Sequence, residues 1–338
     1  MKTSPNALAR SLRKFLTEHM SLARALSPNT VRSYRDTLAL LLRFLSARAG
    51  RPVVALDLPD LDPEGILAFL DDLEARRKNC AATRNVRLAA IHAFARFAAS
   101  QHPEYVETGQ RLLSIPFKRA QLRVIEYLET EEIRALLAAP NRTTLDGSRD
   151  HALLLLMFNT GGRVQEILDV RPCDLQLVRP LQVRLMGKGR KERLCPLWPQ
   201  TASALRGFLE QSRLETTSAD RLFRNQREEP LTRFGVRYLF RKYAAQAASV
   251  SPGLARKRVH PHTMRHTSAV HLLQSGVDLV TISQWLGHAS VNTTNRYAVV
   301  DLETRRAALA KGCPVGDAST VDATWRHDAS ILAWLEAL

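Results

Sequence analysis

The chain has 338 residues, with 49 Lys and Arg against 33 Asp and Glu, which gives a formal net charge of +16. Hydrophobic residues make up 45% and charged residues 24%, an ordinary globular composition that excludes a disordered or collagen-like chain. The longest apolar run, residues 152–158, is far shorter than the roughly 20 residues that a membrane span needs. The length suggests two domains, and the charge favours a polyanionic partner, most simply nucleic acid.

Cysteine usage and the N-terminus bear on the cellular compartment. The four cysteines, at positions 80, 173, 195 and 313, are widely scattered, which argues against a structural zinc site and a disulfide framework. The N-terminus lacks the apolar segment of a secretory signal. Its basic first 28 residues are compatible with a transit peptide, but a DNA-contacting first helix is the preferred interpretation. We therefore expect a cytoplasmic protein.

The first hundred residues are predicted to be helical. One helix begins after the capping residue Ser27 and ends at Gly50, and a second begins at Asp62, where a cap precedes a first-turn proline. A third covers residues 81–100. Apolar residues at steps of three and four give each helix one buried face. These faces are predicted to hold Val31, Tyr34, Leu38, Leu41 and Leu45; Ile66, Phe69, Leu70 and Leu73; and Val86, Ile91, Phe94 and Phe97.

The opposite faces of these helices are basic. Such a run is often only a solvated surface, but here it recurs, at Arg10, Arg13, Lys14, Arg32, Arg35, Arg84, Arg87 and Arg96. We expect a helical DNA-binding domain over residues 1–104. Periodicity is then lost, and prolines, Gly109 and the basic pair Lys118–Arg119 predict a linker over residues 105–125.

The second domain is predicted to be mostly helical with a small β-sheet, over residues 126–311. Thr130 is expected to cap its first helix, and Gly161 to end a buried one. Residues 181–186 and 192–197 predict a hairpin whose basic, glycine-rich tip carries Lys188, Arg190 and Lys191. Further helices are expected at residues 200–210, 232–248, 263–274, 279–286 and 292–311. A tail over residues 312–338 ends in a short helix with one apolar face.

Several common sites are excluded by spacing. Gly187-Lys188-Gly189 lacks the spacing of a phosphate loop, and Gly161-Gly162 is not a dinucleotide-binding fingerprint. His262 and His266 have helical spacing, yet no Glu follows His262 as in a zinc protease, and Arg265 between them would repel a cation. No concentrated set of carboxylates suggests paired Mg²⁺ ions. We therefore expect no metal and no cofactor.

What remains is a set of cationic and neutral donors followed by a tyrosine. The segments read NTGGRVQEIL, MGKGRKERLCPL, HPHTMRHTSAVHLLQSG and ISQWLGHASVNTTNRY. In this order, with the hairpin lysine among them, they resemble the tyrosine recombinase (phage integrase) family over residues 126–310. The family usually carries a larger residue where Gly162 stands. The resemblance implies a SAM-like core-binding bundle at the N-terminus and a recombinase catalytic domain.

The resemblance also implies roles for six side chains. Tyr297 would be the nucleophile that forms a 3′-phosphotyrosine bond, and Arg163 and Arg265 would stabilise the charge that develops on the phosphate. Lys188 would protonate the departing 5′ oxygen. His262 would assist proton transfer at the nucleophile, and His288 would hydrogen-bond the phosphate. Glu166, one helical turn after Arg163, would orient that arginine as a supporting residue.

Each residue also has a structural interpretation. Tyr297 could be a core tyrosine, and Arg163 could simply pair with Glu166. Lys188 could be a solvated turn residue, and His262 could cap its helix. His260, His266 and His271 are interpreted as structural or phosphate-contacting. The proposed DNA contacts outside the catalytic set are Arg32, Arg35, Arg84, Arg87, Lys118, Arg119, Arg190 and Lys191.

The expected reaction is site-specific DNA recombination of the integration, excision or transposition type, through a Holliday junction. By resemblance, the two domains would clamp duplex DNA at specific sites, in a synaptic homotetramer that is monomeric or dimeric off DNA. The protein would be bacterial and nucleoid-associated when acting, with accessory proteins as further partners. The tail helix, with Ile331, Trp334 and Leu335, is predicted to dock on a neighbouring subunit. A type IB-like topoisomerase and a non-catalytic DNA-binding relative remain the alternatives.

Overall fold

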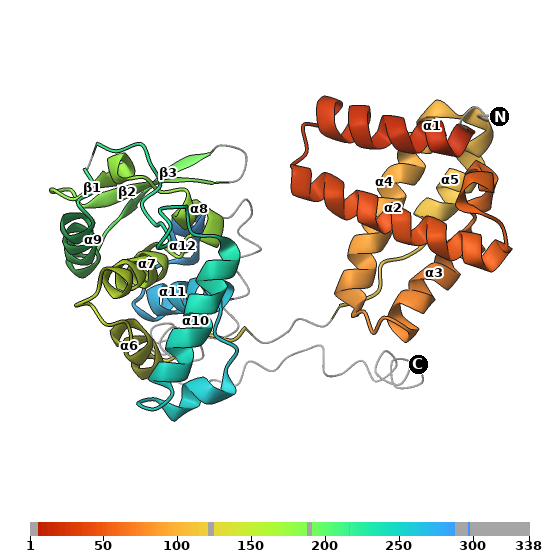
Figure 1. Cartoon of the computed structure of the whole chain (residues 1–338). Coiled ribbons are helices and arrows are strands. Elements are labelled where there is room, and N and C mark those ends of the chain that lie inside the picture. Colours follow the sequence, from red (N-terminus) through yellow and green to blue (C-terminus); the bar gives the residue numbers. More distant parts are fainter. Residues whose placement is uncertain (1–5, 121–124, 188–190, 216, 288–296, 298–338) are drawn as a thin grey trace, which may run out of the picture. The chain divides into compact units, whose positions relative to one another are not determined.

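The computed structural model describes residues 6–120, 125–187, 191–215, 217–287 and 297, and it divides the chain into two compact units that meet between Arg123 and Val124 (Figure 1). Each unit has its own hydrophobic core. In the part of the chain that the structure describes, no helix has the length and apolar character of a membrane span.

The N-terminal unit is a helical bundle. Its helices are α1 (Ala7–Lys14), which continues into a π-helix (Phe15–Ala23), α2 (Pro28–Ala49), α3 (Pro63–Ala75), α4 (Ala81–Gln101) and α5 (Val106–Leu113). Ser27 and Asp62 cap α2 and α3 through hydrogen bonds from backbone amides three residues on, as the sequence predicts. Gly50 ends α2 with a φ of 64°, a conformation that favours glycine.

The bundle core confirms most of the predicted faces but not that of α4. Phe15 packs edge-on against Phe94, with ring centroids 5.4 Å apart, among buried leucines of α2 and α3. On α4, however, Val86 is 53% exposed and Arg84 only 3% exposed. The buried stripe continues from Arg84 through Leu88, and residues two positions apart on a helix lie on opposite sides. The predicted face was therefore wrong at Val86.

The segment predicted as an irregular linker contains α5. Gly109, taken as a loop signal, lies within this helix, where a Cβ would come 3.1 Å from the Cβ of Ala99 on α4. Leu112 and Ile115 are buried in the bundle core, and the Tyr105 hydroxyl donates to the Leu61 carbonyl at 3.0 Å. The glycine thus serves a close helix–helix approach, and chain up to at least residue 115 belongs to the first core.

The C-terminal unit combines seven α-helices, within its described residues, with a small antiparallel sheet of order β1-β2-β3. The strands are β1 (Leu175–Gln176), β2 (Gln182–Met186) and β3 (Glu192–Pro196), and Val183 lies opposite Cys195. The hairpin was predicted, whereas β1 was not. The helices are α6 (Thr130–Ala138), α7 (Leu145–Thr160), α8 (Val164–Leu168), α9 (Pro199–Ser212), α10 (Arg233–Ala247), α11 (Pro261–Gln274) and α12 (Leu279–Leu286).

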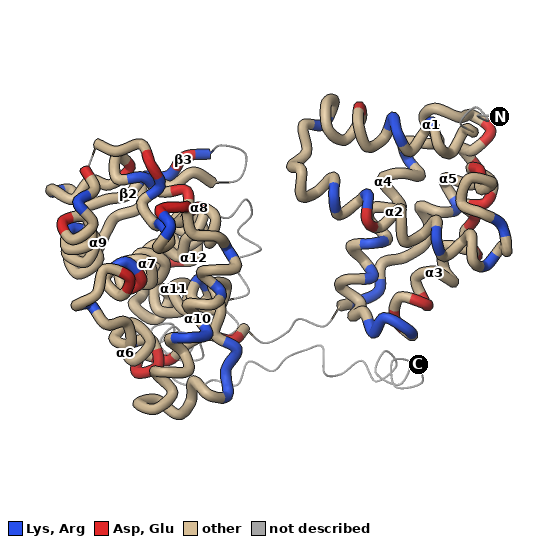
Figure 2. Tube along the Cα trace, in the orientation of Figure 1, with Lys and Arg blue, Asp and Glu red and all other residues tan. Residues whose placement is uncertain are grey.

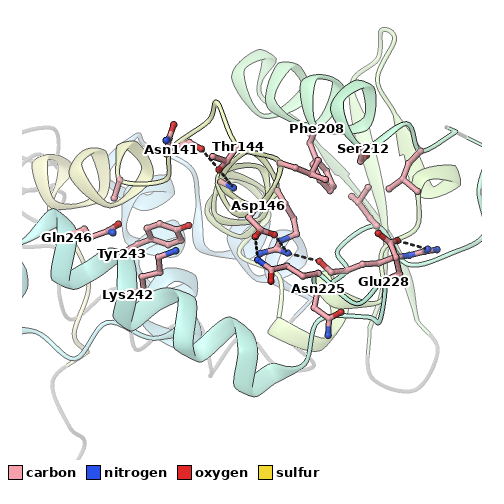
Figure 3. Close-up of a pocket in the computed structure, with 18 residues that line it drawn as sticks. Asn141, Thr144, Asp146, Phe208, Ser212, Asn225, Glu228, Lys242, Tyr243 and Gln246 are labelled. Carbon is pink, nitrogen blue, oxygen red and sulfur yellow. Dashed lines mark hydrogen bonds and ion pairs between the residues drawn. The ribbon is translucent and has the colours of Figure 1, made fainter.

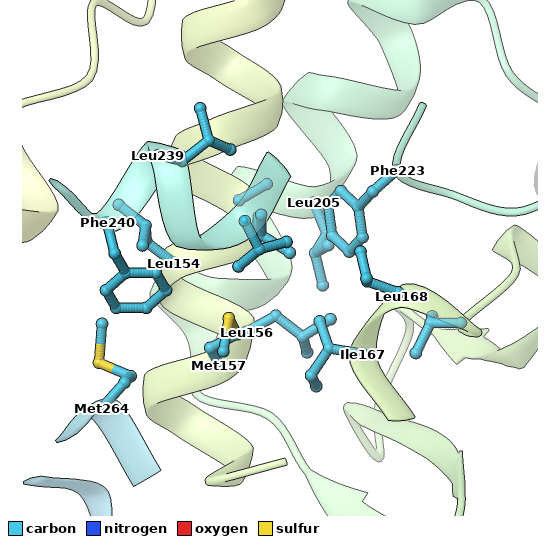
Figure 4. Close-up of a cluster of buried hydrophobic side chains, with 14 of the residues drawn as sticks. Leu154, Leu156, Met157, Ile167, Leu168, Leu205, Phe223, Leu239, Phe240 and Met264 are labelled. Atoms are coloured by element: carbon cyan, nitrogen blue, oxygen red, sulfur yellow. The ribbon is translucent and has the colours of Figure 1, made fainter. Parts of the chain in front are cut away.

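Helix α7 forms the centre of this unit. Most of its run of apolar residues is buried, and side chains from α8, α9, α10 and α11 pack around it (Figure 4). Leu154 and Met157 of α7 lie near Phe240 and Met264, while Ile167 and Phe223 close the other side. Gly161 ends α7 with a φ of 57°, as predicted. The cap of α6 is Glu129 rather than the predicted Thr130.

A smaller cluster lies against α11 and α12. It contains Ile125, Ala269, Val270, Leu273, Ile282, Leu286 and Tyr297, and is called here the Tyr297 cluster. Tyr297 is described by itself, with neither of its chain neighbours. The predicted helix over residues 292–311 and the tail lie otherwise outside the described residues, as do Lys188, Arg190 and His288.

Candidate active site

A pocket of about 280 Å³ opens where α8, α10 and α11 begin. Four arginines and two histidines are among its lining residues, and none of the described lining residues is acidic. Helix α10, which borders the pocket, carries Lys and Arg but no Asp or Glu (Figure 2). Such a pocket suits an anion that can accept several hydrogen bonds. Its lining residues are Gly162, Arg163, Val164, Arg233, Arg237, His260, Pro261, His262 and Arg265.

Arg163 enters this pocket from the cap of α8. Its Nη1 donates to Glu166 Oε1 at 2.7 Å, and its Nη1 and Nη2 approach the Gly287 carbonyl at 3.4 and 3.3 Å. Glu166 also accepts from the Arg163 backbone amide at 3.1 Å. The side chain of Arg163 remains 38% exposed, so part of its guanidinium is open to a ligand. Glu166 therefore holds both the guanidinium and the backbone amide of Arg163.

Arg265 is buried beneath the pocket, with 5% exposure. It donates to the Gly161 carbonyl at 2.6 Å and to the Leu286 carbonyl at 2.8 Å. These carbonyls end α7 and α12, where a helix dipole favours a cation. Burial and the nearby charge of Arg163 lower the pKa of Arg265 to about 10, so it stays protonated at neutral pH.

A second arginine holds Glu166 from the hairpin. Arg193 on β3 donates to Glu166 Oε2 at 2.7 Å and to the Trp285 carbonyl at 3.0 Å. Burial alone would raise the pKa of Glu166, but Arg193 and Arg163 outweigh it and the pKa is lowered. Arg193 was not among the residues predicted from the sequence. The sequence does place Arg193 two residues before Cys195, on the same face of the strand, and Cys195 is buried. A charged residue on a buried strand face needs a partner, and this was the available indication.

His260 and His262, at the start of α11, have different surroundings. His260 caps the helix, because its Nδ1 accepts from the backbone amides of His262 and Thr263, both at 3.2 Å. The cap therefore lies two residues before His262. Partial burial lowers the pKa of His262, and the charges of Arg265 and Arg163 lower it further. His262 is thus neutral at pH 7 and lines the pocket through a ring that reaches solvent.

Tyr297 lies beside α11, in the Tyr297 cluster. Its ring is 2% exposed, and its hydroxyl oxygen is 2.9 Å from Nδ1 of His266. From the sequence, His266 was interpreted as structural or phosphate-contacting and was not linked to Tyr297. Its position one turn after His262 was the available signal.

Two glycines shape the backbone around the site. Gly287 ends α12 with a φ of 64°, directly before His288, and a Cβ there would come 2.9 Å from Nη1 of Arg193. At Gly162, where the family usually has a larger residue, a Cβ would come 2.6 Å from Cδ1 of Ile167. The Ile167 side chain therefore occupies the space that a larger residue at position 162 would need.

The structure separates the proposed DNA-contacting residues by exposure. Arg32, Arg35, Lys118, Arg119 and Lys191 are exposed, although Arg35 pairs with Asp36 and Lys118 with Glu74. Arg87 is half-buried and donates to the Thr37 hydroxyl at 2.8 Å.

Arg84 departs from the expectation of an exposed basic face, because it lies inside the bundle, 3.8 Å from Glu74. Arg233 and Arg237 at the catalytic pocket were missed. Among the described residues, no cluster of three or more His, Cys, Asp or Glu is arranged to hold a metal ion.

A separate hollow of about 610 Å³ lies between the start of α7, α9 and α10 (Figure 3). Its polar side chains satisfy one another: the Tyr243 hydroxyl donates to Asp150 at 2.7 Å, and the buried Arg149 pairs with Asp146 and Asp150, both at 2.8 Å. None of the motif residues lines it. We interpret this network as structural.

Comparison with known proteins agrees with the motif order. Residues 126–303 match the phage integrase family, and residues 12–102 match the phage integrase N-terminal SAM-like domain. A Sinorhizobium fredii protein described as an integrase/recombinase is 41% identical over 336 residues, which cover 99% of this chain and all of the relative. Tyrosine recombinase XerC of Pelobacter propionicus is 31% identical, over 88% of this chain and 93% of the relative.

A solved structure shares the fold. The XerH site-specific recombinase bound to its palindromic difH substrate superposes with a TM-score of 0.67 at 22% identity, over 88% of this chain and 83% of that one. These relatives are recombinases, and they give no support to the topoisomerase or non-catalytic alternatives. The chain belongs to the phage integrase family and is a tyrosine recombinase, an enzyme of site-specific DNA recombination.

Proposed function

We propose that Arg163, His262 and Arg265 bind the scissile phosphate of a specific DNA site, and that Tyr297 attacks it. The observation that supports this assignment is that Arg163, far from His262 and Arg265 in the sequence, lines one cationic pocket with them. The helix that supplies His262 and Arg265 also supplies His266, the partner of the Tyr297 hydroxyl.

The two arginines suit the charge that develops during the reaction. A phosphorane gains negative charge on its non-bridging oxygens, and each guanidinium presents fixed paired donors to such oxygens. Because Arg163 and Arg265 are already tied to Glu166 and to helix-terminal carbonyls, little reorganisation is needed when the charge forms. Removing one such donor from an active site costs about 3–4 kcal/mol of barrier.

In the proposed cleavage step, the Tyr297 oxygen forms a bond to phosphorus and the bond to the 5′ oxygen breaks. The products are a 3′-phosphotyrosine linkage and a free 5′-hydroxyl. The covalent bond retains the energy of the phosphodiester, so the rejoining step needs no ATP. Lys188 donates the proton to the leaving oxygen and His288 hydrogen-bonds the phosphate; both assignments come from the motifs, since these residues lie outside the described ones.

The proposed assembly follows from the same chemistry. Exchange of strands between two duplexes needs four nucleophiles, so we propose a homotetramer on paired sites and a four-way junction as the intermediate. Residues 1–104 and 126–311 would each bind DNA, and the tail over residues 312–338 would contact a neighbouring subunit. A protein lacking residues 325–338 should bind DNA normally but fail to form tetramers in native mass spectrometry of the DNA complex; normal tetramers would contradict this role.

Covalent trapping tests the catalytic assignment. Wild-type protein and the Tyr297→Phe variant are incubated in EDTA with nicked duplexes drawn from DNA flanking the gene. We expect a covalent adduct with a free 5′-hydroxyl end for the wild type alone. An adduct that persists in Tyr297→Phe would show that another residue is the nucleophile.

A further inference from the structure

The oxygen of the proposed nucleophile lies within hydrogen-bonding distance of His266, which is outside the six side chains given roles by the motifs. His266 Nδ1 and the Tyr297 hydroxyl are 2.9 Å apart, and their ring centroids are separated by 5.6 Å at an interplanar angle of 58°. His266 directly follows Arg265 on α11 and lies one helical turn after His262. The helix that carries phosphate ligands therefore also carries a direct partner of the reacting oxygen.

The surroundings of Tyr297 create a need for a proton acceptor. The ring is 2% exposed and packs in an apolar cluster that includes Ile125, Val270 and Leu286. A phenol with a pKa of about 10 keeps its proton at neutral pH; the apolar side chains do not favour its loss, whereas the nearby charge of Arg265 does. The phenolic proton must then pass to a group within hydrogen-bonding distance as the oxygen attacks. A neutral imidazole meets this need, because Nδ1 accepts a hydrogen bond when the ring proton is on Nε2.

His262 is placed for a different task. It lines the cationic pocket with Arg163 and Arg265. Partial burial lowers its pKa, and the charges of the two arginines lower it further. The described lining residues of that pocket do not include His266 or Tyr297. One turn of α11 thus separates an imidazole on the phosphate side from an imidazole on the nucleophile side.

We propose that His266, rather than His262, receives the proton of Tyr297 during strand cleavage. The inference rests on the proposed function, since it takes Tyr297 as the nucleophile. The hydroxyl proton moves to Nδ1 of His266 as the oxygen bonds to phosphorus, and the bond to the 5′ oxygen breaks with protonation by the general acid. In rejoining, the incoming 5′-hydroxyl displaces the tyrosine, and His266 returns the proton to the phenolic oxygen.

A measurement without DNA tests the contact itself. In the full chain labelled with ¹⁵N-histidine, the His266 ring signals are assigned by their loss in His266→Asn. We expect the Nδ1 signal of an unprotonated acceptor in the wild type, and a clear shift of that signal in Tyr297→Phe. An identical His266 signal in both proteins would overturn the proposal, whatever the outcome of DNA cleavage.

The chemical role is tested by the rate of covalent adduct formation on a nicked duplex that the wild type cleaves. His266→Phe preserves a ring but removes the acceptor, and should lower this rate about 100-fold or more, as for other general bases. His266→Asn retains a hydrogen bond to the hydroxyl but cannot accept the proton. Its rate of adduct formation should therefore lie between those of the wild type and His266→Phe. Replacing Tyr297 with the more acidic 3,5-difluorotyrosine should restore much of the rate lost in His266→Phe, because less assistance is then needed to remove the proton.

His271 provides the matched control on the same helix. Its Nε2 contacts the Leu128 carbonyl at 3.3 Å and its ring packs against Phe158. His271→Phe should cleave at close to the wild-type rate, and difluorotyrosine should bring it no special benefit. A His266→Phe protein that cleaves as fast as the wild type would overturn the role of His266 while leaving Tyr297 as nucleophile. Adducts in Tyr297→Phe would instead overturn the proposed function.

Discussion

Arg193 on β3 and Glu166 on α8 form a buried ion pair with an N–O distance of 2.7 Å. Because the same carboxylate also holds Arg163, this pair connects the hairpin with the arginine that we propose binds the phosphate. Arg193 additionally fixes the end of α12 through the Trp285 carbonyl, two residues before Gly287. The position of the catalytic arginine therefore depends on a residue that has no contact with DNA in the proposed mechanism.

Replacing Arg193 should weaken both folding and cleavage. In Arg193→Ala the Glu166 carboxylate keeps only Arg163, and leaving a buried charged group partly unsatisfied costs about 1–3 kcal/mol of unfolding free energy. Urea unfolding measures this loss. The control is Arg184→Ala on β2, whose guanidinium pairs with Asp174 but is open to solvent, so its removal should cost clearly less than that of Arg193. Equal losses in the two variants would contradict a special role for Arg193.

The stability contributed by Glu166 should depend on pH. Its pKa is lowered from an ordinary value of 4.5, so the folded state binds this proton less readily than the unfolded state. The contribution is therefore fully present above pH 4.5 and is lost as the pH falls through the lowered folded value. Wild type should be more stable than Glu166→Gln at pH 7, and the difference should shrink in unfolding curves recorded at successively lower pH below 4.5. A difference that grows as the pH falls would show that the sign is wrong.

Arg265 should not tolerate lysine. Its guanidinium bridges the Gly161 and Leu286 carbonyls, and an ammonium group cannot reach both while presenting paired donors to a phosphate. We expect Arg265→Lys to lower the rate of adduct formation about 100-fold or more. Arg258→Lys, at an exposed position before α11, should cleave at a rate close to the wild type.

Arg233 and Arg237 should contribute to DNA affinity without selecting a sequence. Both line the cationic pocket from α10, where they are exposed and lie one turn apart. Each alanine variant should weaken binding to arbitrary duplex DNA and reduce the slope of log affinity against log salt by about 1. Fluorescence anisotropy at several salt concentrations measures the slope. Arg206→Ala on α9, outside the pocket, should leave it unchanged.

Gly162 should be coupled to Ile167. A Cβ at position 162 would meet the isoleucine Cδ1 at 2.6 Å, so Gly162→Ala should cost about 1–3 kcal/mol through overpacking. Ile167→Val removes the opposing methyl group. The double variant should therefore be more stable than the sum of the two single effects, which a double-mutant cycle by urea unfolding would measure. Simple additivity would contradict the contact.

Local patterns in the sequence were sufficient for most of the fold. The spacing of apolar residues and the caps Ser27, Asp62 and Gly161 predicted α2, the start of α3 and the end of α7, because these signals act within a single helix. The start of α7, at Leu145, lies before the predicted residues 152–158. The hairpin was likewise visible from its two strands and its glycine-rich tip. Gly109 was misinterpreted since only the bundle shows that its missing side chain admits Ala99.

The supporting residues of the site could not be found in this way. Arg193 reaches Glu166 across 27 positions and His266 reaches Tyr297 across 31, and no local periodicity records such pairs. Arg84 shows the same limit in the bundle, where its side chain is buried beside Glu74 rather than exposed. The motifs named the residues of the phosphate site, while the partners of those residues required the structure.

Helix α11 carries His262, Arg265 and His266 within a single stretch of five residues. A helix rises about 1.5 Å per residue, so the positions of His262 and His266 are offset by about 6 Å along the helix axis, and this offset is fixed as long as the helix stays intact. A shift of α11 would move His262, Arg265 and His266 together and leave the spacing between them unchanged. Bending or untwisting of the duplex is one way for different DNA sites to fit this fixed spacing, so we expect easily deformed sequences to be favoured even at base pairs that no side chain touches.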